Sequence, residues 1–104
     1  MALPPLSTEQ RRAALNKAVA ARKERAAIKD ALKHGKSSLR EVLAEDSETI
    51  RRMPVRALLE ALPAIGKIRA RKVLAELRIS EGRRVRGLGP QQRKRLLDRF
   101  ATQH

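Results

Sequence analysis

Residues 62–74 read LPAIGKIRARKVL, and this stretch decides the fold because it places a tight turn between two helices. An apolar helical pattern ends at Leu62, Pro63 fixes its own φ, and we expect Ile65 to turn inward. Gly66 can adopt backbone conformations that are closed to residues with a side chain. The next helix then begins with backbone N–H groups that have no partner inside the helix, beside the positive end of its dipole. Such a turn predicts a phosphate-binding hairpin that reads no base sequence.

Helical patterns fill most of the remaining chain, and no alternating pattern of convincing length predicts a strand. Capping boxes, in which a Ser is followed three residues later by Glu or Gln, begin at Ser7 and Ser38. Pro54 and Pro90 fit the first position of two further helices. We therefore expect an all-α fold with helices at residues 8 to about 34 (closed by Gly35), a short one from 39, 54–62, 67–77 and 90–100.

The pattern divides the chain into a long N-terminal helix and a compact helical domain. The long helix has mostly Ala at its apolar positions until Ile28 and Leu32, so only its C-terminal part is expected to contact a core. We assign residues 1–36 to this basic helix and 37–104 to the domain. The other apolar positions are Leu39, Val42, Leu43, Val55, Leu58, Leu59, Leu62, Ile68, Ala70, Val73, Leu74, Leu77, Leu96, Leu97 and Phe100, with Val85 and Leu88 plugging the core from a connector.

The charge of the chain indicates a polyanionic partner. The formal net charge is +14 and the pI is about 11.6. Nine Lys/Arg and three acids fall in residues 1–36, and fifteen Lys/Arg and four acids in 51–104, whereas 37–50 hold one Arg and four acids. No apolar run of about 20 residues predicts a membrane span. Cysteine is absent, which fits the cytoplasm, and Phe100 is the single aromatic, which argues against a base-stacking platform.

A second basic element, EGRRVRGLG at residues 81–89, lies between the last two predicted helices. If Val85 points into the core, Arg84 and Arg86 can both face a phosphate backbone, and Arg is also the residue that enters a narrow minor groove. The candidate DNA-binding residues are Pro63, Ala64, Ile65, Gly66, Lys67, Arg69 and Arg71 at the hairpin and Arg83, Arg84, Arg86, Gly87 and Gly89 in the loop, with a possible second contact through Arg12, Lys17, Arg22, Lys23 and Arg25. The alternatives are a plain helical corner and a solubilising basic loop.

The hairpin resembles the helix-hairpin-helix motif, roughly L-P-G-I-G followed by x-x-x-A-x-x-I/V-L, with Ala64 in place of the first Gly. Together with RRVRGLG, LLDRF and the start MALPPL, the whole chain resembles the actinobacterial integration host factor family, and its C-terminal part looks like a helix-two-turn-helix unit. The resemblance implies an all-α, nucleoid-associated protein that binds duplex DNA with little sequence preference, compacts it and assists phage integration. Duplex DNA and a phage integrase are the implied partners, in the nucleoid of the cytoplasm.

Other functions are less consistent with the sequence. A ribosomal protein of the small-subunit head shares a similar unit, which makes binding of rRNA the alternative, although that family carries the unit in its N-terminal half. Glycosylase chemistry lacks its N-terminal Pro nucleophile, because residue 2 is Ala. The sequence also lacks the aromatic residues that would form a pocket for a flipped base. Two-metal nuclease chemistry lacks acidic clusters, and His34 and His104 are isolated. The Ala-rich face of the first helix is too weak for interfacial membrane insertion. We expect a monomer that is not an enzyme and needs no cofactor or metal.

Overall fold

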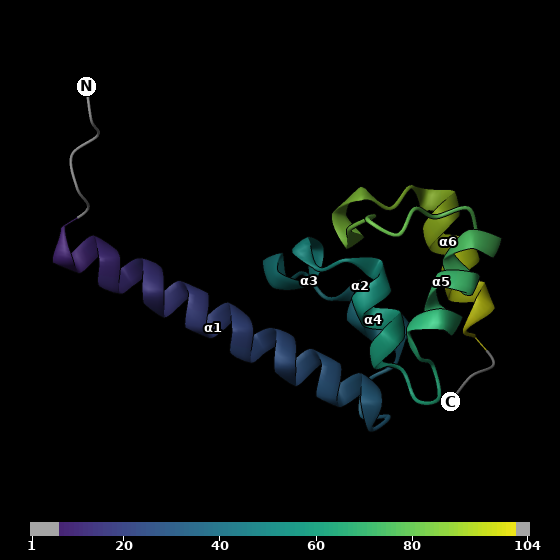
Figure 1. The fold of residues 1–104 in the computed structure, drawn as a ribbon, viewed down its shortest axis with the longest axis horizontal. Helices are drawn as coiled ribbons and strands as arrows, with labels where there is room; N and C mark the ends of the chain where they lie inside the picture. The colour runs from purple at the N-terminus through teal and green to yellow at the C-terminus, as the bar shows by residue number, and fades with distance from the viewer. Residues whose placement is uncertain (1–6, 102–104) are drawn as a thin grey trace.

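The computed structural model describes residues 7–101, so the MALPPL start and residues 102–104 lie outside the described part. Within that part the chain is all-α, and its one strand-like feature is an isolated antiparallel bridge between Pro54 and Arg84 (Figure 1). The elements are α1 (Thr8–Lys33), α2 (Leu39–Ala44), α3 (Glu48–Arg52), α4 (Val55–Ala61), α5 (Lys67–Glu76), a short 3-10 helix η1 (Val85–Gly87) and α6 (Pro90–Arg99).

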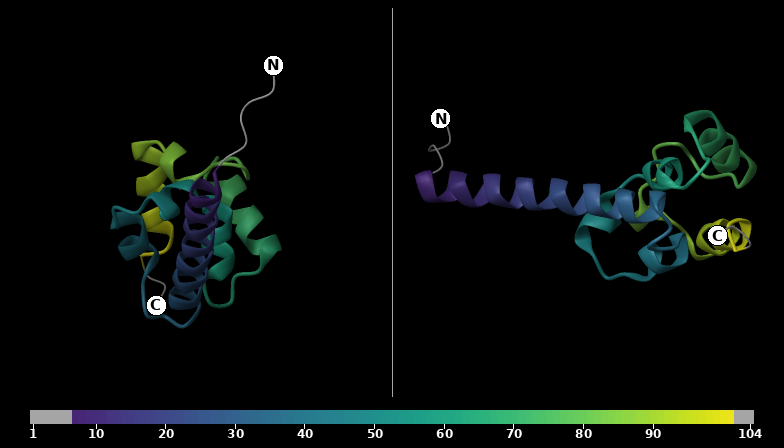
Figure 2. Two further views of the ribbon diagram at one scale, coloured as in Figure 1. Left: turned by 90° about the vertical axis from the view of Figure 1, so that its left-hand side faces the viewer. Right: turned by 90° about the horizontal axis from the view of Figure 1, so that it is seen from below.

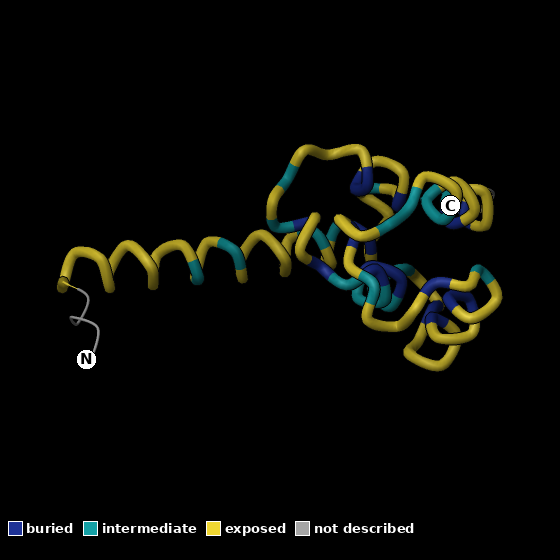
Figure 3. Tube along the Cα trace, turned by 90° about the horizontal axis from the view of Figure 1, so that it is seen from above, coloured by how far each residue is buried: buried dark blue, intermediate teal, exposed yellow. Residues whose placement is uncertain are grey.

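Helix α1 projects from a compact head, which we define as residues 39–101 (Figures 1 and 2). The C-terminal half of α1 packs on α3 and α4, where Leu32 is buried and Ile28 partly buried. The N-terminal half is exposed around almost its whole circumference (Figure 3). These observations confirm that only the C-terminal part of the first helix is anchored, and they explain the elongated extents of 52 × 31 × 25 Å.

Local sequence signals account for both ends of α1. The capping boxes at Ser7 and Ser38 both form, so the predicted starts of α1 and α2 are confirmed. At the C-terminal end, Gly35 has a φ of 70°, and the Lys36 N–H donates to the Ala31 carbonyl at 2.8 Å. This arrangement is a Schellman motif, which glycine favours because the left-handed backbone conformation crowds a side chain.

Two predicted boundaries were wrong. The sequence predicts only one short helix between the long helix and Pro54, whereas the structure has a second one, α3. Ser47 caps α3 because its Oγ accepts the Ile50 N–H at 3.3 Å. Pro54 is the N-cap of α4 rather than its first residue, with extended ψ of 139°. The chain stays extended there because Pro54 takes part in the bridge to the basic loop.

The core of the head is formed by aliphatic side chains from every helix. The largest fully buried ones are Leu32, Ile50, Met53, Val55, Leu58, Leu59, Leu74 and Leu96. Ile65 and Val85 reach the core from the two connectors, as predicted, and Leu88 packs partly against it. One expectation was wrong: Ile68, taken as part of the apolar set, leaves 72% of its surface exposed.

The bridge fixes the basic loop against the start of α4. The Val55 N–H donates to the Arg83 carbonyl at 2.9 Å, and the Val85 N–H donates to the Met53 carbonyl at 3.0 Å. The hairpin at residues 62–66 follows the other end of α4. Loop and hairpin are therefore held at opposite ends of this short helix, roughly 12 Å apart along its axis at 1.5 Å per residue.

Candidate nucleic-acid interface

The hairpin between α4 and α5 has its unusual backbone conformation at Ala64 rather than at Gly66. Ala64 has a φ of 63°, in the left-handed region, whereas Gly66 is extended with φ −93° and ψ −178°. A Cβ on Gly66 would meet no atom within 4 Å. The expectation that Gly66 takes a conformation closed to side chains was therefore wrong, and the strained position is the one where the motif has its first Gly. Ile65 faces inward and holds the turn on the core.

The start of α5 offers free hydrogen-bond donors. Gly66 is its exposed N-cap and supplies no side-chain cap, and the first hydrogen bond within the helix is from the Ala70 N–H to the Gly66 carbonyl at 3.0 Å. The amides of Lys67, Ile68 and Arg69 have no acceptor among the described residues. Three free N–H groups at the positive end of a helix dipole form a binding position for a phosphate oxygen.

Cations surround these amides without being neutralised. Lys67, Arg69 and Lys72 are exposed, and none of them pairs with a carboxylate within residues 7–101. Arg71 differs, because its Nε lies 3.6 Å from Glu81 Oε1. Both of those side chains are more than half exposed, so the pair contributes little to stability and leaves the Arg71 guanidinium available.

The arginines of the basic loop differ in their contacts: two are exposed and one bonds within the loop. Val85 is buried, and Arg84 and Arg86 on either side of it are exposed, as its alternation predicts. Arg83 instead folds back, and its Nη1 donates to the Gly87 carbonyl at 3.0 Å. A Cβ on Gly87 would lie 3.1 Å from the Arg83 Cδ, so this glycine makes room for a side chain of the protein itself. Gly89 caps α6, and its N–H donates to the Gln92 Oε1 at 3.0 Å.

A groove joins the hairpin to α1. It has a volume of about 660 Å³ and is lined on one side by residues 61–66 and on the other by Lys29 and Lys33 of α1, with Asp30 and Glu60 among its other lining residues. Lys29 and Lys33 were not among the residues predicted to contact DNA. The signal was present, because at 100° per residue they fall on the same side of the helix as Arg22 (i, i+7, i+11).

The five predicted basic residues of α1 are all exposed but do not form one face. Around the helix, Arg25 lies about 60° from Arg22 on one side, and Arg12 and Lys23 lie about 80° and 100° from it on the other. Lys17 is about 140° from Arg22. Arg22 continues the line of the two groove lysines, roughly 10 to 17 Å further along the helix at 1.5 Å per residue. The side of α1 that borders the hairpin is thus basic well beyond the groove.

Comparison with known proteins identifies the family. Residues 32–100 match the model of the S13-like H2TH domain. The chain is 55% identical over 102 residues to the integration host factor of Mycolicibacterium smegmatis, covering 96% of this chain and 97% of the relative. It is 54% identical over 104 residues to the integration host factor of Mycobacterium tuberculosis, covering 98% and 99%. The chain belongs to the actinobacterial integration host factor family. A third relative of the same name, from Streptomyces coelicolor, is 56% identical over 94 residues and covers 88% of each chain.

The fold of this family member agrees with a solved structure. A chain described as sIHF bound to an 8-bp palindromic DNA superposes with a TM-score of 0.79 at 49% identity, covering 82% of this chain and 98% of that one. The predicted all-α architecture and the resemblance to actinobacterial integration host factors are thereby confirmed. Among residues 7–101, no group of three or more His, Asp or Glu side chains is placed to hold a metal ion. None of the described helices is long and apolar enough to cross a membrane.

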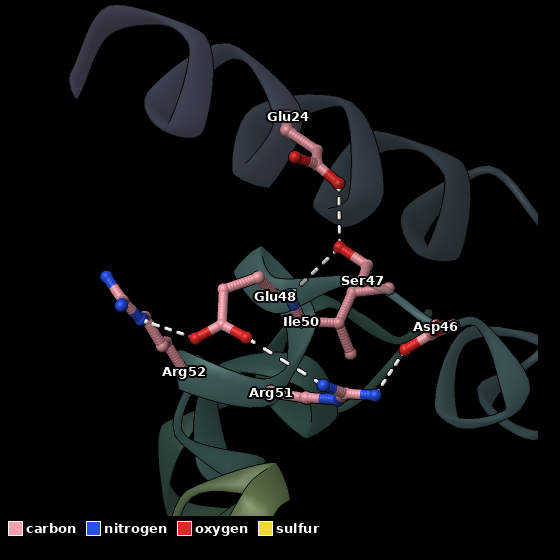
Figure 4. Close-up of polar contacts among 7 residues, drawn as sticks. All are labelled: Glu24, Asp46, Ser47, Glu48, Ile50, Arg51 and Arg52. Atoms are coloured by element: carbon pink, nitrogen blue, oxygen red, sulfur yellow. Dashed lines mark hydrogen bonds and ion pairs between the residues drawn. The ribbon is translucent and has the colours of Figure 1, made fainter. Parts of the chain in front are cut away.

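A polar contact joins α1 to α3 of this integration host factor (Figure 4). Glu24 of α1 accepts hydrogen bonds from the Ser47 Oγ and the Thr49 Oγ1, each at 2.7 Å. Both bonds lower the pKa of the Glu24 carboxyl below its ordinary value, and the bond from Thr49 has the larger effect. Ser47 also caps α3, so its hydroxyl joins α1, the projecting arm, to the first turn of a helix of the head. Arg51 and Arg52 lie beside Asp46 and Glu48 around α3, so the charge there is more nearly balanced than at the start of α5.

Proposed function

We propose that this integration host factor is a nucleoid-associated protein that binds double-stranded DNA mainly through its phosphates. The observation that carries the proposal is the start of α5. Three amides there have no acceptor within residues 7–101, and the side chains of Lys67 and Arg69 beside them have no carboxylate partner in the same range. The DNA complex described for the solved neighbour supports the same partner. In this proposal one phosphate sits on the amides after Gly66, and the exposed Arg84 and Arg86 contact phosphates of the other strand along the minor groove.

The spacing of the two elements suits one duplex. Hairpin and loop are separated by the length of α4, roughly 12 Å along its axis. A B-form duplex presents phosphates on both sides of grooves that are about 12 Å and about 6 Å wide. The two elements can therefore bind the two strands across one groove, and α4 acts as the rigid spacer between them. Arg83 and Gly87 then support the loop from within rather than contact DNA, because they bond to each other.

Helix α1 extends this surface along the same duplex. Lys29 and Lys33 face the hairpin across the groove, and Arg22 follows on the same side of the helix. Like charges gathered on one side with few acids among them produce a field that a polyanion neutralises. Arg25, about 60° from Arg22 around the helix, stays nearest to this side, and Arg12 and Lys23 lie at its edge. Lys17, about 140° from Arg22, points elsewhere and is the residue best placed to touch a second duplex. Contact with two duplexes would compact DNA without requiring a dimer.

The proposed binding has little sequence preference. Phosphate contacts carry no base information, and few polar side chains at the interface are free to read base edges. Gln92 is occupied, because its Oε1 accepts from the Gly89 N–H and its Nε2 donates to the Arg78 carbonyl at 3.4 Å. Any preference would come from DNA shape and ease of bending. Bending and compaction by a monomer in the nucleoid, and help to a phage integrase acting on the bent DNA, complete the proposal.

Titration by fluorescence anisotropy tests the proposal, with a duplex of about 20 bp over a series of salt concentrations. Binding weakens as salt rises, and each phosphate contact contributes about 0.9 to the steepness of log K against log salt. The steepness should fall by about two in each of two double variants, Arg84→Ala/Arg86→Ala and Lys29→Ala/Lys33→Ala. The matched control is Arg40→Ala/Lys94→Ala, which removes the same charge from the hollow between α2 and α6. An equal loss of slope in the control would show that net charge, and not this surface, governs binding.

Binding of rRNA is the second candidate, because the matching family model is described as S13-like. Duplex RNA has a deep, narrow major groove and a wide, shallow minor groove, so phosphates are spaced differently across it. The same titration with a matched RNA duplex separates the candidates. Tighter binding to RNA at every salt concentration would replace the DNA proposal by the ribosomal one.

A further inference from the structure

Within the head, residues 39–101, Ile68 is the one large apolar side chain that is exposed rather than packed in the core. It leaves 72% of its surface exposed, more than Leu15 at 66% or Val19 at 44% on α1, although it lies on a helix of the compact head. Helix α5 buries Ala70, Val73 and Leu74. At 100° per residue Ile68 lies about 160° from Ala70, on the crest that points away from the core. No packing reason places an isoleucine at this position.

The surroundings of Ile68 are those of the proposed DNA site. It is the second residue of α5, and its own amide is one of the three without an acceptor. Arg69 and Arg71 flank the crest, and Lys72 follows Ile68 by one turn. Side chains in a helix lean towards its N-terminus, so Ile68 leans towards the free amides that would hold a phosphate. An aliphatic group thus stands within a ring of cations at the place where a DNA strand would dock.

We propose that Ile68 is a DNA-shaping residue that inserts its side chain into the minor-groove side of the bound duplex. The inference rests on the proposed function and adds an apolar contact to it. Phosphates and cations account for the rim, but the next surface that a docked helix end meets is the wall of deoxyribose rings, which is apolar. Aliphatic side chains that enter this groove partly unstack a base step and bend the duplex towards the major groove. Charge complementarity brings the strand to the amides, and Ile68 then converts close approach into a bend.

The chemistry also predicts where on DNA the contact is favourable. Pyrimidine–purine steps such as TA unstack easily, whereas A-tracts resist deformation. The Ile68 contact therefore supplies a shape preference without any base-edge hydrogen bond. Duplexes with a central TA step should be bent more, and bound more tightly, than duplexes whose centre is an A-tract.

The test uses the full chain and an end-labelled duplex of about 20 bp with one central TA step. Anisotropy gives the affinity over a salt series, and energy transfer between the two ends gives the bend. Ile68→Ala should weaken binding about tenfold at every salt concentration, because it removes most of the buried aliphatic surface, and should lower energy transfer. Its salt slope should stay that of the wild type, since no phosphate contact is lost. Ile68→Leu should retain both affinity and bend.

Two further variants keep the inference falsifiable. Leu15→Ala removes a similarly exposed aliphatic side chain from α1 and should leave affinity and bend unchanged. Ile68→Lys adds a cation: a steeper slope with a lost bend supports the apolar contact, whereas tighter binding with the full bend overturns it. Ile68→Ala that binds within twofold of the wild type and bends DNA equally also overturns it. If the wild type itself fails to bind the duplex, the proposed function fails instead, and the two failures are distinguishable.

Discussion

The hairpin stores backbone strain that a single substitution should release. Ala64 has a φ of 63°, a conformation that crowds the Cβ of an L-residue against the carbonyl that follows. Glycine has no Cβ and adopts this conformation freely. Ala64 is exposed, so Ala64→Gly removes no core contact. We therefore expect this alanine-to-glycine change to stabilise the protein, although such changes normally destabilise a folded chain.

The expected magnitude is a difference between two effects. The left-handed conformation costs an alanine about 1 to 2 kcal/mol, which the substitution recovers. Glycine also gains freedom in the unfolded chain, which destabilises the folded state by about 0.4 to 1 kcal/mol. The net gain should be roughly 0.5 to 1 kcal/mol. In a domain of this size it corresponds to a rise of about 2 to 8 °C in Tm.

Urea unfolding followed by circular dichroism measures this gain, with Ala75→Gly as the matched control. Ala75 is an exposed residue inside α5 with ordinary helical geometry, so its substitution should destabilise by about 0.5 to 1 kcal/mol. The two alanine-to-glycine changes should thus have opposite signs. If Ala64→Gly destabilises the protein as much as Ala75→Gly does, the strain at the hairpin is not real and the argument fails.

Three other perturbations test the arrangement of the head and the arm. Arg78 has a φ of 58° just after α5, so Arg78→Gly should raise the urea midpoint by a similar amount, and a lowered midpoint would contradict this. Leu74→Ala should lower the free energy of unfolding by about 2 to 5 kcal/mol in the same assay, because Leu74 is fully buried, and a loss under 1 kcal/mol would show a core that collapses around the gap. The lowered pKa of Glu24 means that its contact with the head is fully present above the ordinary glutamate pKa and is lost as the pH falls through the lowered value. Distances between spin labels on cysteines introduced at Leu15 and on the head should broaden at that pH, and Glu24→Gln should broaden them at neutral pH; unchanged distances in both cases would remove the role of Glu24.

Features that depend on local sequence could be predicted. The capping boxes and Gly35 define the ends of α1 and the start of α2, since each acts within a few residues. The alternation around Val85 gave the orientation of Arg84 and Arg86, since a single buried residue fixes its two neighbours. These signals need no knowledge of the tertiary structure.

Features that depend on contacts between distant parts of the chain could not be predicted. Helix α3 has five residues and little helical signal of its own, and it is held by Ser47 and by the contact with Glu24, which is 23 residues earlier in the chain. The extended backbone at Pro54 follows from the bridge to Arg84, which lies even further away in the sequence. Lys29 and Lys33 became candidates only when the fold brought the hairpin to their side of α1. The exposure of Ile68 could have been predicted, because at 100° per residue it lies on the side of the helix opposite Ala70; its apolar character alone placed it in the predicted core.

The projecting half of α1 has a consequence for how this family can change over time. Since its side chains touch almost nothing but solvent, insertions or deletions there leave the head intact. Adding seven residues would extend the helix by about 10 Å and turn its basic side by only about 20°, whereas adding four would turn it by about 40°. The length of the projecting part of α1 can thus change in steps of about two helical turns while its basic side keeps nearly the same direction, independently of the folding of the head.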